Sequence, residues 1–396
     1  MSKVPSPSPA DRTQKRLLHC VLFTFFVSGV TSQPLGSFIP FLRQAYGFRY
    51  ELSGILLSCQ SAGNLLAVLL AGILPGILGR RRSILVTAVW MAVGYLIFLS
   101  GLGAAGMLMA AFLMTGIARG GNSNFSNTMI STLPGEESSR GYNLLHGCYA
   151  VGALLSPLAL VLCVRLRPDT GWRVLAALLC LLAVSQLAVY AKMPLPPEEP
   201  KRGGRAIDHD FLREKRFWLS SAMLFFYASA EYAIVGWLVT YFQDAGILGA
   251  NLSQMMNSLL WLVIFLGRMA GAALSGRISR YKLLLFDGCA LPAFFLLLLF
   301  GRSTPLIILG LVGVGLSMST IYPTALSFGS DSIRGNDFGC SILIITGCTG
   351  GLIAPALVGF AAEWGGIRAG MGLIAVFSVL LLLSILLSVR MIGTAS

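Results

Sequence analysis

The sequence predicts an all-α polytopic membrane protein with twelve transmembrane helices in two pseudo-symmetric six-helix halves. Three observations support this fold class. First, the 396 residues are 56% hydrophobic and only 11% charged, whereas a soluble domain of this size carries about a quarter charged residues. Second, the hydrophobic residues are grouped in segments of about 20 residues, the length that crosses a bilayer. Third, a charged, proline-rich segment near the middle separates two sets of these segments, and the two sets share short motifs.

Twelve apolar segments, each bounded by Gly, Pro or charged residues, are expected to form the helices. The chain also has 45 glycines, which suits the close packing of membrane helices. The expected helices cover residues 17–42, 51–74, 83–101, 105–133, 140–164, 172–193, 216–242, 252–276, 282–300, 304–329, 337–361 and 367–390.

The Lys and Arg residues are distributed unequally between alternate loops. Twenty lie on the side that holds both termini, seven lie on the other side, and Arg119 and Arg268 fall within helices. Because cytoplasmic loops carry the excess of Lys and Arg, both termini are predicted to lie in the cytoplasm. The protein is accordingly expected to be an integral protein of the cell (inner) membrane. The same scatter argues against nucleic-acid binding, despite the net charge of +13, since the basic residues form no continuous face.

The charge and proline content predicts five regions. Residues 1–16 are polar and Pro/Ser-rich and are expected to be disordered, and residues 391–396 form a cytoplasmic tail. The halves are residues 17–193 and 216–390, joined by the cytoplasmic linker 194–215, "PLPPEEPKRGGRAIDHDFLREK". The eight cysteines lie in or beside apolar runs without a CxxC or Cys/His cluster. No disulfide framework, metal site or cofactor is therefore predicted.

Two short motifs repeat at equivalent places in the halves. "AGILPGILGRRRSIL" (71–85) aligns without gaps to "GAALSGRISRYKLLL" (271–285), and Gly152-x4-Pro157 matches Gly350-x4-Pro355. Two repeated six-helix halves with a long central loop are the organisation of major facilitator transporters. The paired loops are expected to stabilise one conformation through contacts with the other half. Their candidate residues are Gly72, Arg80, Arg82, Gly276 and Arg280.

The motifs also resemble a known family. "GILPGILGRRR" is similar to the major facilitator loop signature Gly-x-Leu-Ala-Asp-Arg-x-Gly-Arg-Arg, although Gly76 stands where the signature has Asp. "EYAIVGWLVTYF" (231–242) and "NLLHGCYAVGALLSP" (143–157) resemble the fucose:proton symporter family, which includes fucose permease-like and glucose/galactose porters. The resemblance implies the major facilitator fold, sugar transport by alternating access, and a seventh helix that bends, here near Gly236.

Polar residues inside the expected helices are the candidates for a midplane site, because polar groups at that depth are costly and are retained for function. Arg119 lies on a helical stripe with Thr115, Asn122, Ser123 and Ser126. Glu231 is placed near the middle of the seventh helix. Three roles stay open for it: an acceptor for sugar hydroxyls, the coupling carboxylate, or a structural partner of Arg119 or Arg268.

Amides, hydroxyls and aromatic rings on the inner helices suit a sugar, since rings stack on its apolar face and polar groups bind its hydroxyls. The candidate substrate-binding residues are Gln33, Gln60, Asn64, Arg119, Asn122, Ser126, Tyr227, Glu231, Trp237, Tyr241, Asn257, Trp261 and Tyr322. Glu231 and Arg119 are also the candidate coupling residues.

The family pattern fails at two positions. The resemblance places the proton-carrying acids of the fucose permease-like members at Gln33 and Ser123, and neither is acidic here. Sodium coupling, proton coupling through Glu231, and uncoupled facilitation all stay open. We expect a monomer that binds a sugar-like small molecule and H+ or Na+ within the lipid bilayer.

The main rival is a drug, metabolite or organic-anion exporter of the same superfamily. Pro157 is followed by "LALVL" rather than the glycine pair typical of drug:proton antiporters, and Arg119 could hold a carboxylate. An enzyme or ATP-driven pump is not predicted, because the chain has no G-x4-GK[ST] loop. The sugar and the direction of transport stay undetermined.

Overall fold

The structure, a computed structural model, describes residues 9–71, 73–132, 135–195, 210–274, 278–330, 332–333 and 337–393. The helices of the first half are α1 (Pro9–Ser32), α2 (Pro34–Tyr46), α3 (Tyr50–Ala71), α4 (Leu74–Leu78), α5 (Arg80–Leu99), α6 (Ala105–Ser131), α7 (Gly135–Leu166) and α8 (Gly171–Lys192). Those of the second half are α9 (Lys215–Asp244), α10 (Ala250–Leu274), α11 (Arg280–Phe300), α12 (Thr304–Ser330), α13 (Asp337–Gly365) and α14 (Ile367–Gly393), preceded by the 3-10 helix η1 (Asp210–Arg213).

The twelve predicted segments each correspond to long helix, with α1 and α2 together forming the first. Within the described residues, eleven such segments are long and apolar enough to cross a membrane. The twelfth, α6, has 27 residues, but its Arg, Asn and Ser residues make it too polar for that criterion. The predicted all-helical membrane fold is therefore confirmed, and the polar exception is a helix that lines the interior.

The first and seventh predicted helices differ in their continuity. The first is interrupted at Gln33, because Pro34, which has no N–H to donate, begins α2. The seventh, α9, is one continuous helix through Gly236, so its hydrogen-bonded backbone is not interrupted there. Gly236 serves packing: a Cβ at this position would lie 2.8 Å from Leu57 Cδ1.

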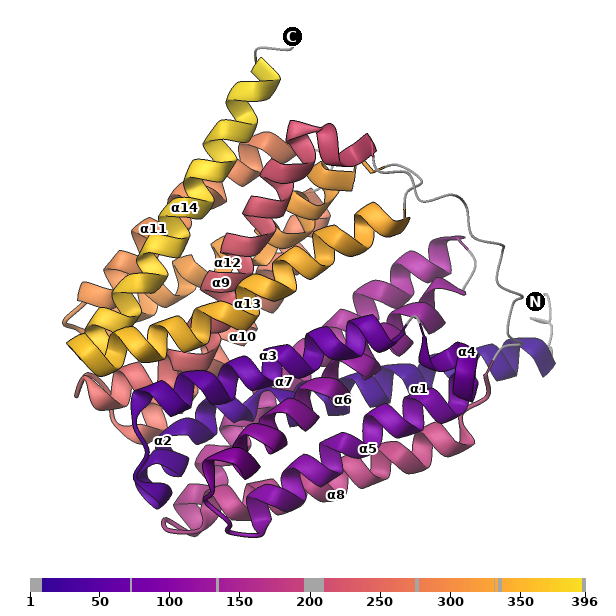
Figure 1. Ribbon diagram of the computed structural model, residues 1–396, viewed down its shortest axis with the longest axis horizontal. Helices are drawn as coiled ribbons and strands as arrows, with labels where there is room; N and C mark the ends of the chain where they lie inside the picture. The colour runs from indigo at the N-terminus through magenta and orange to yellow at the C-terminus, as the bar shows by residue number, and fades with distance from the viewer. Residues whose placement is uncertain are drawn as a thin grey trace, which may run out of the picture.

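Helices α1–α8 and α9–α14 form two groups that lie close at one end and diverge toward the other (Figure 1). Contacts between the groups are made mainly by α3 with α13, α7 with α10, and α2 with α9. We call the end that holds Tyr46, Asp244 and Gly365 the closed end. The opposite end, where α8 stops at Lys192 and α9 starts at Lys215, is the open end.

Close backbone contact seals the closed end. Gly54 of α3 crosses α13 so closely that a Cβ on it would lie 2.5 Å from Pro355 O and 3.1 Å from Gly359 Cα. Ser58 Oγ, one turn further, accepts a hydrogen bond from Ala356 N at 3.1 Å. Small residues such as glycine let two helices approach this closely, so this crossing fixes how the halves meet.

The arginines of the paired loops bond carbonyls of their own half in this conformation. Arg81 donates hydrogen bonds to Tyr190 O at 3.1 Å and Met193 O at 2.7 Å, at the C-terminal end of α8. Arg280 donates to Ser327 O at 3.5 Å in α12. These bonds lie within one half, where they satisfy carbonyls left free at helix ends. The expected contacts with the other half belong to a state closed at this end and stay a prediction. Arg82 is exposed, Arg80 lines a separate cavity of about 180 Å³, and Gly72 and Gly276 lie outside the described residues.

Candidate functional site

Two adjoining cavities lie between the halves. The larger has a volume of about 410 Å³ and is lined by residues of both halves, among them Asn64, Ser123, Asn127, His146, Tyr149, Arg268 and Tyr322. The smaller, of about 40 Å³, lies toward the closed end and includes Gln33, Gln60 and Pro355. Both are lined by Arg119, Glu231, Tyr232 and Trp261, so we treat them as one central cavity.

Three charged residues line this cavity. Arg119 comes from α6, Glu231 from α9 and Arg268 from α10. Among the described residues, none of the three has an ion-pair partner within 4.0 Å. The pairing of Arg119 with Glu231 that we considered is therefore not formed in this conformation.

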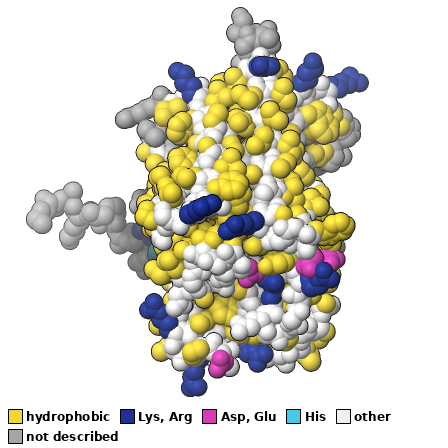
Figure 2. All heavy atoms as spheres, turned by 90° about the vertical axis from the view of Figure 1, so that its left-hand side faces the viewer, with side chains coloured by type: hydrophobic (Ala, Val, Ile, Leu, Met, Phe, Trp, Pro, Cys, Tyr) yellow, Lys and Arg dark blue, Asp and Glu magenta, His cyan; other side chains and the backbone are white. Residues whose placement is uncertain are grey.

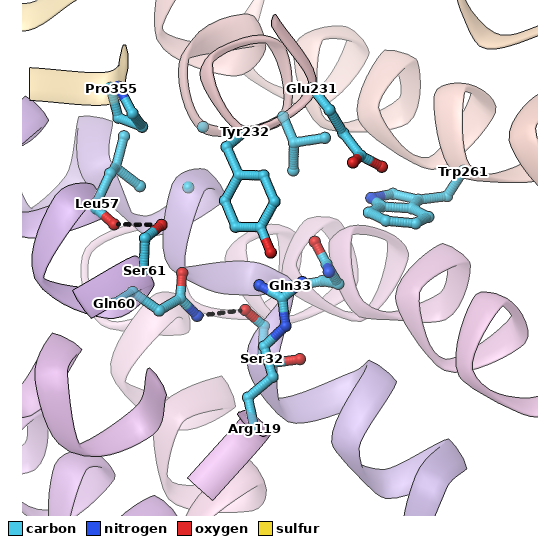
Figure 3. Close-up of a pocket in the computed structure, with 13 residues that line it drawn as sticks. Ser32, Gln33, Leu57, Gln60, Ser61, Arg119, Glu231, Tyr232, Trp261 and Pro355 are labelled. Carbon is cyan, nitrogen blue, oxygen red and sulfur yellow. Dashed lines mark hydrogen bonds between the residues drawn. The ribbon is translucent and has the colours of Figure 1, made fainter. Parts of the chain in front are cut away.

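Arg119 contacts the other half through an aromatic ring. Its guanidinium carbon lies 5.4 Å from the centre of the Tyr232 ring, a distance at which a cation is attracted to the ring face. Figure 3 shows the Tyr232 hydroxyl pointing toward Arg119 across the cavity. This contact joins α6 of the first half to α9 of the second, so a substitution of Arg119 alters a contact between the halves.

Amides and aromatic groups complete the cavity wall. Gln33 Nε2 donates to Tyr149 Oη at 2.7 Å and Gln60 Nε2 donates to Ser32 O at 3.0 Å, the latter drawn in Figure 3. Trp261 packs edge-on against Tyr149, with ring centres 6.2 Å apart. The Trp261 indole N–H is buried without a hydrogen-bond partner among the described residues. It is therefore a donor available to a bound solute.

The predicted stripe on α6 is divided between two directions. Asn122 donates to Thr24 O at 2.9 Å and accepts hydrogen bonds from Ser126, at 3.1 Å, and from Tyr190. These contacts tie α6 to α1 and α8 within the first half, so Asn122 and Ser126 do not line the cavity. Ser123 and Asn127, which follow Arg119 at helical spacing, do line it. The spacing identified the polar helix but not which polar residues face the centre.

Four other candidates also lie outside the cavity. Tyr227, Trp237 and Tyr241 are fully buried and donate to Met318 O, Pro355 O and Leu299 O, at 2.9, 3.1 and 2.8 Å. Asn257 donates to Ser37 Oγ at 3.3 Å, which joins the halves near the closed end. The polar atoms of Tyr227, Trp237 and Tyr241 are each satisfied by a carbonyl of the second half, so these three side chains stabilise helix packing.

Tyr149, Tyr232 and Arg268 line the cavity but were not among the candidate substrate-binding residues. Tyr232 follows Glu231 in the sequence, and successive side chains on a helix point about 100° apart. Helical spacing therefore did not place Tyr232 on the same face as Glu231. Arg268 had a usable signal, because it is one of two arginines within predicted membrane helices. Its position at depth was itself an indication of function.

A charged cluster bridges the halves at the closed end. Arg43 and the Tyr50 hydroxyl both bond Asp244 Oδ2, the hydroxyl at 2.9 Å. The Arg43 guanidinium lies 3.8 Å from the centre of the Tyr50 ring, and Arg49 pairs with Glu363. Figure 2, which views the molecule from this end, shows acidic side chains beside basic ones near the middle of the face. These bonds hold the closed end shut.

Comparison with known proteins agrees with this architecture. The family model of the Major Facilitator Superfamily matches residues 21–348. The chain belongs to the Major Facilitator Superfamily. This superfamily consists of membrane transporters rather than enzymes, and the predicted membership is confirmed.

Similar members of the superfamily are distant in sequence. An uncharacterized MFS-type transporter of Yersinia pestis is 23% identical, over 92% of this chain and 93% of that protein. A glucose/mannose transporter of Bacillus subtilis, GlcP, is also 23% identical, over 90% of each chain. The solved structure of the Escherichia coli fucose:proton symporter, FucP, has a TM-score of 0.64 at 18% identity, covering 94% of this chain and 98% of that one. The structural likeness shows the shared fold.

Proposed function

We propose that this transporter moves a small, sugar-like solute by alternating access, and that the solute binds in the central cavity. The observation that carries the proposal is the composition of this cavity. It combines one carboxylate, Glu231, with the amides Gln33, Gln60 and Asn64 and the aromatic residues Trp261 and Tyr322. Paired donors and acceptors with aromatic faces suit a polyhydroxylated ring. The larger part of the cavity has a volume of about 410 Å³, which falls in the usual range of small-molecule sites.

The proposal includes an orientation and a coupling residue. The open end carries the excess of Lys and Arg expected of cytoplasmic loops. We therefore place both termini in the cytoplasm of the cell membrane and interpret the structure as the inward-open state. Glu231 is the acidic residue that lines the cavity in the described part of the chain. It is accordingly proposed to carry H+ or Na+ together with the solute.

The test is a thermal-stability screen of the purified monodisperse protein in detergent. A ligand that binds only the folded state raises stability by about 2.7 kcal/mol at a hundred times its dissociation constant. We expect neutral hexoses, deoxyhexoses or sugar acids to raise the midpoint, and amphiphilic drugs not to. Asp169→Asn changes an exposed carboxylate in the loop after α7 and serves as the matched control for Glu231→Gln.

The outcomes separate the roles of Glu231 and of the cavity. A sugar-dependent shift that is lost in Glu231→Gln but retained in Asp169→Asn would place the solute beside Glu231. A shift retained in both variants would remove Glu231 from the binding site and leave it as a coupling or structural group. Shifts seen only with drugs would overturn the sugar proposal and support an exporter.

A further inference from the structure

The charges of the central cavity do not balance. Arg119 and Arg268 each contribute one positive charge, whereas Glu231 contributes one negative charge. The other titratable groups that face the cavity are neutral in their usual states: His146, Tyr149, Tyr232, Tyr322 and Cys348. The cavity therefore has an excess of one positive charge in this conformation.

The two cavity arginines also differ from other arginines of the protein in their partners. At the closed end, Arg43 and Arg49 pair with carboxylates, and at the open end Arg81 bonds carbonyls of α8. Neither Arg119 nor Arg268 has a carboxylate within 4.0 Å in the described ranges. The Arg119 guanidinium carbon lies 5.4 Å from the centre of the Tyr232 ring. Two guanidinium groups with donors to spare thus face the same cavity.

Alternating access makes this excess charge costly. When the halves close around a solute, bulk water leaves the cavity and an uncompensated cation loses its hydration. A neutral sugar would leave the excess in place, whereas a carboxylate on the solute would cancel it. A guanidinium binds a carboxylate through two parallel hydrogen bonds, so the free donors match this group in geometry as well as in charge.

We infer that the central cavity selects a hydroxylated solute with one carboxylate, a sugar acid, over the corresponding neutral sugar. This inference rests on the proposed function and specifies its substrate class. The carboxylate binds between Arg119 and Arg268, and the hydroxyls bind the amides and Glu231. Trp261, 5% exposed and lining both parts of the cavity, donates its unpartnered indole N–H to an oxygen of the solute (Figure 3).

The test compares solutes that differ only in the carboxylate. Dissociation constants are measured by calorimetry on the full-length protein at fixed ionic strength, for D-glucuronate against D-glucose and D-galacturonate against D-galactose. We expect the acid to bind about tenfold more tightly than its neutral partner, as a charge-assisted hydrogen-bond pair provides. Arg268→Gln should remove this preference, because it lowers the affinity for the acid more than the affinity for the neutral sugar.

Two further variants separate charge from structure. Arg268→Lys keeps the charge without the planar fork and should recover part of the preference. Arg302→Gln removes an arginine from the exposed loop between α11 and α12 at the closed end and should leave the preference unchanged. A wild type that binds the neutral sugar as tightly as the acid would overturn the inference and leave sugar transport standing. So would an acid preference that survives Arg268→Gln, whereas binding of neither class would overturn the proposed function as well.

Discussion

The charged cluster at the closed end provides the sharpest test of the conformational mechanism. Asp244 of the second half is bonded by Arg43 and by the Tyr50 hydroxyl, both of the first half. Replacing Asp244 with Ala removes both bonds at once without altering the lining of the central cavity. Because these bonds exist only while the closed end is shut, the substitution should favour the state in which this end opens.

The magnitude follows from the exposure of the pair. The Arg43 and Asp244 side chains are 21% and 25% exposed, which places their ion pair near the upper end of the surface range, about 1 kcal/mol. The hydrogen bond from Tyr50 to a charged acceptor adds at most about 1 kcal/mol more at this exposure. A total of about 1–2 kcal/mol changes the ratio of the two states by about 5- to 30-fold.

The assay is a distance distribution between spin labels, measured by double electron–electron resonance. Labels replace Arg167 and Arg302, which are exposed in loops at the closed end of opposite halves, in a protein whose native cysteines are substituted. Asp244→Ala should add a population at longer distance. Asp169→Asn, which removes an exposed carboxylate at the same end, should not.

The wild-type equilibrium could favour the closed state so strongly that one substitution leaves the open population undetectable. The double variant Asp244→Ala, Glu363→Ala extends the test to that case. Glu363 accepts from Arg49 and from Tyr50 N, the latter at 3.0 Å, so its loss removes the second connection between the halves. A distance distribution unchanged in both the single and the double variant would refute the reasoning, because the cluster would then contribute nothing to closure.

Three other predictions concern packing and the cavity wall. Gly54→Ala should lower the free energy of unfolding by about 1–3 kcal/mol, because its Cβ would meet backbone atoms of α13 at 2.5–3.1 Å. The control is Gly106→Ala, whose Cβ would have nothing within 4 Å. It should be neutral in the same thermal melt. Trp261→Phe should weaken solute binding about tenfold with little change in stability, since its N–H has no partner in the described structure; an equal loss of stability would contradict this. Asn122→Ala should lower stability by about 1 kcal/mol while the dissociation constant of the solute stays unchanged, because Asn122 bonds α1 and α8 rather than the cavity.

Part of the candidate site could be predicted from the sequence. Arg119 and Glu231 were found because a charge inside a membrane helix is expensive wherever that helix lies, and both line the cavity. Tyr227, Trp237 and Tyr241 were candidates on the same reasoning, yet their polar atoms bond carbonyls of neighbouring helices. Burying a hydroxyl or indole N–H costs little free energy once it donates a hydrogen bond to a carbonyl. Its presence deep in the membrane therefore does not distinguish a packing role from a binding role.

The sequence by itself determined the helices and their number, because the length of an apolar run and the cost of burying bare backbone groups are local properties. It also indicated the two halves, through their repeated motifs and the charged segment between them. Only the tertiary structure decided which face of α6 meets the cavity, where the first helix breaks, and which end is shut. Helical spacing tells which residues share a face, but the direction of that face depends on the neighbouring helices. The state of the ends depends on a few bonds between residues about 200 or more positions apart, such as Arg43 with Asp244 and Arg49 with Glu363.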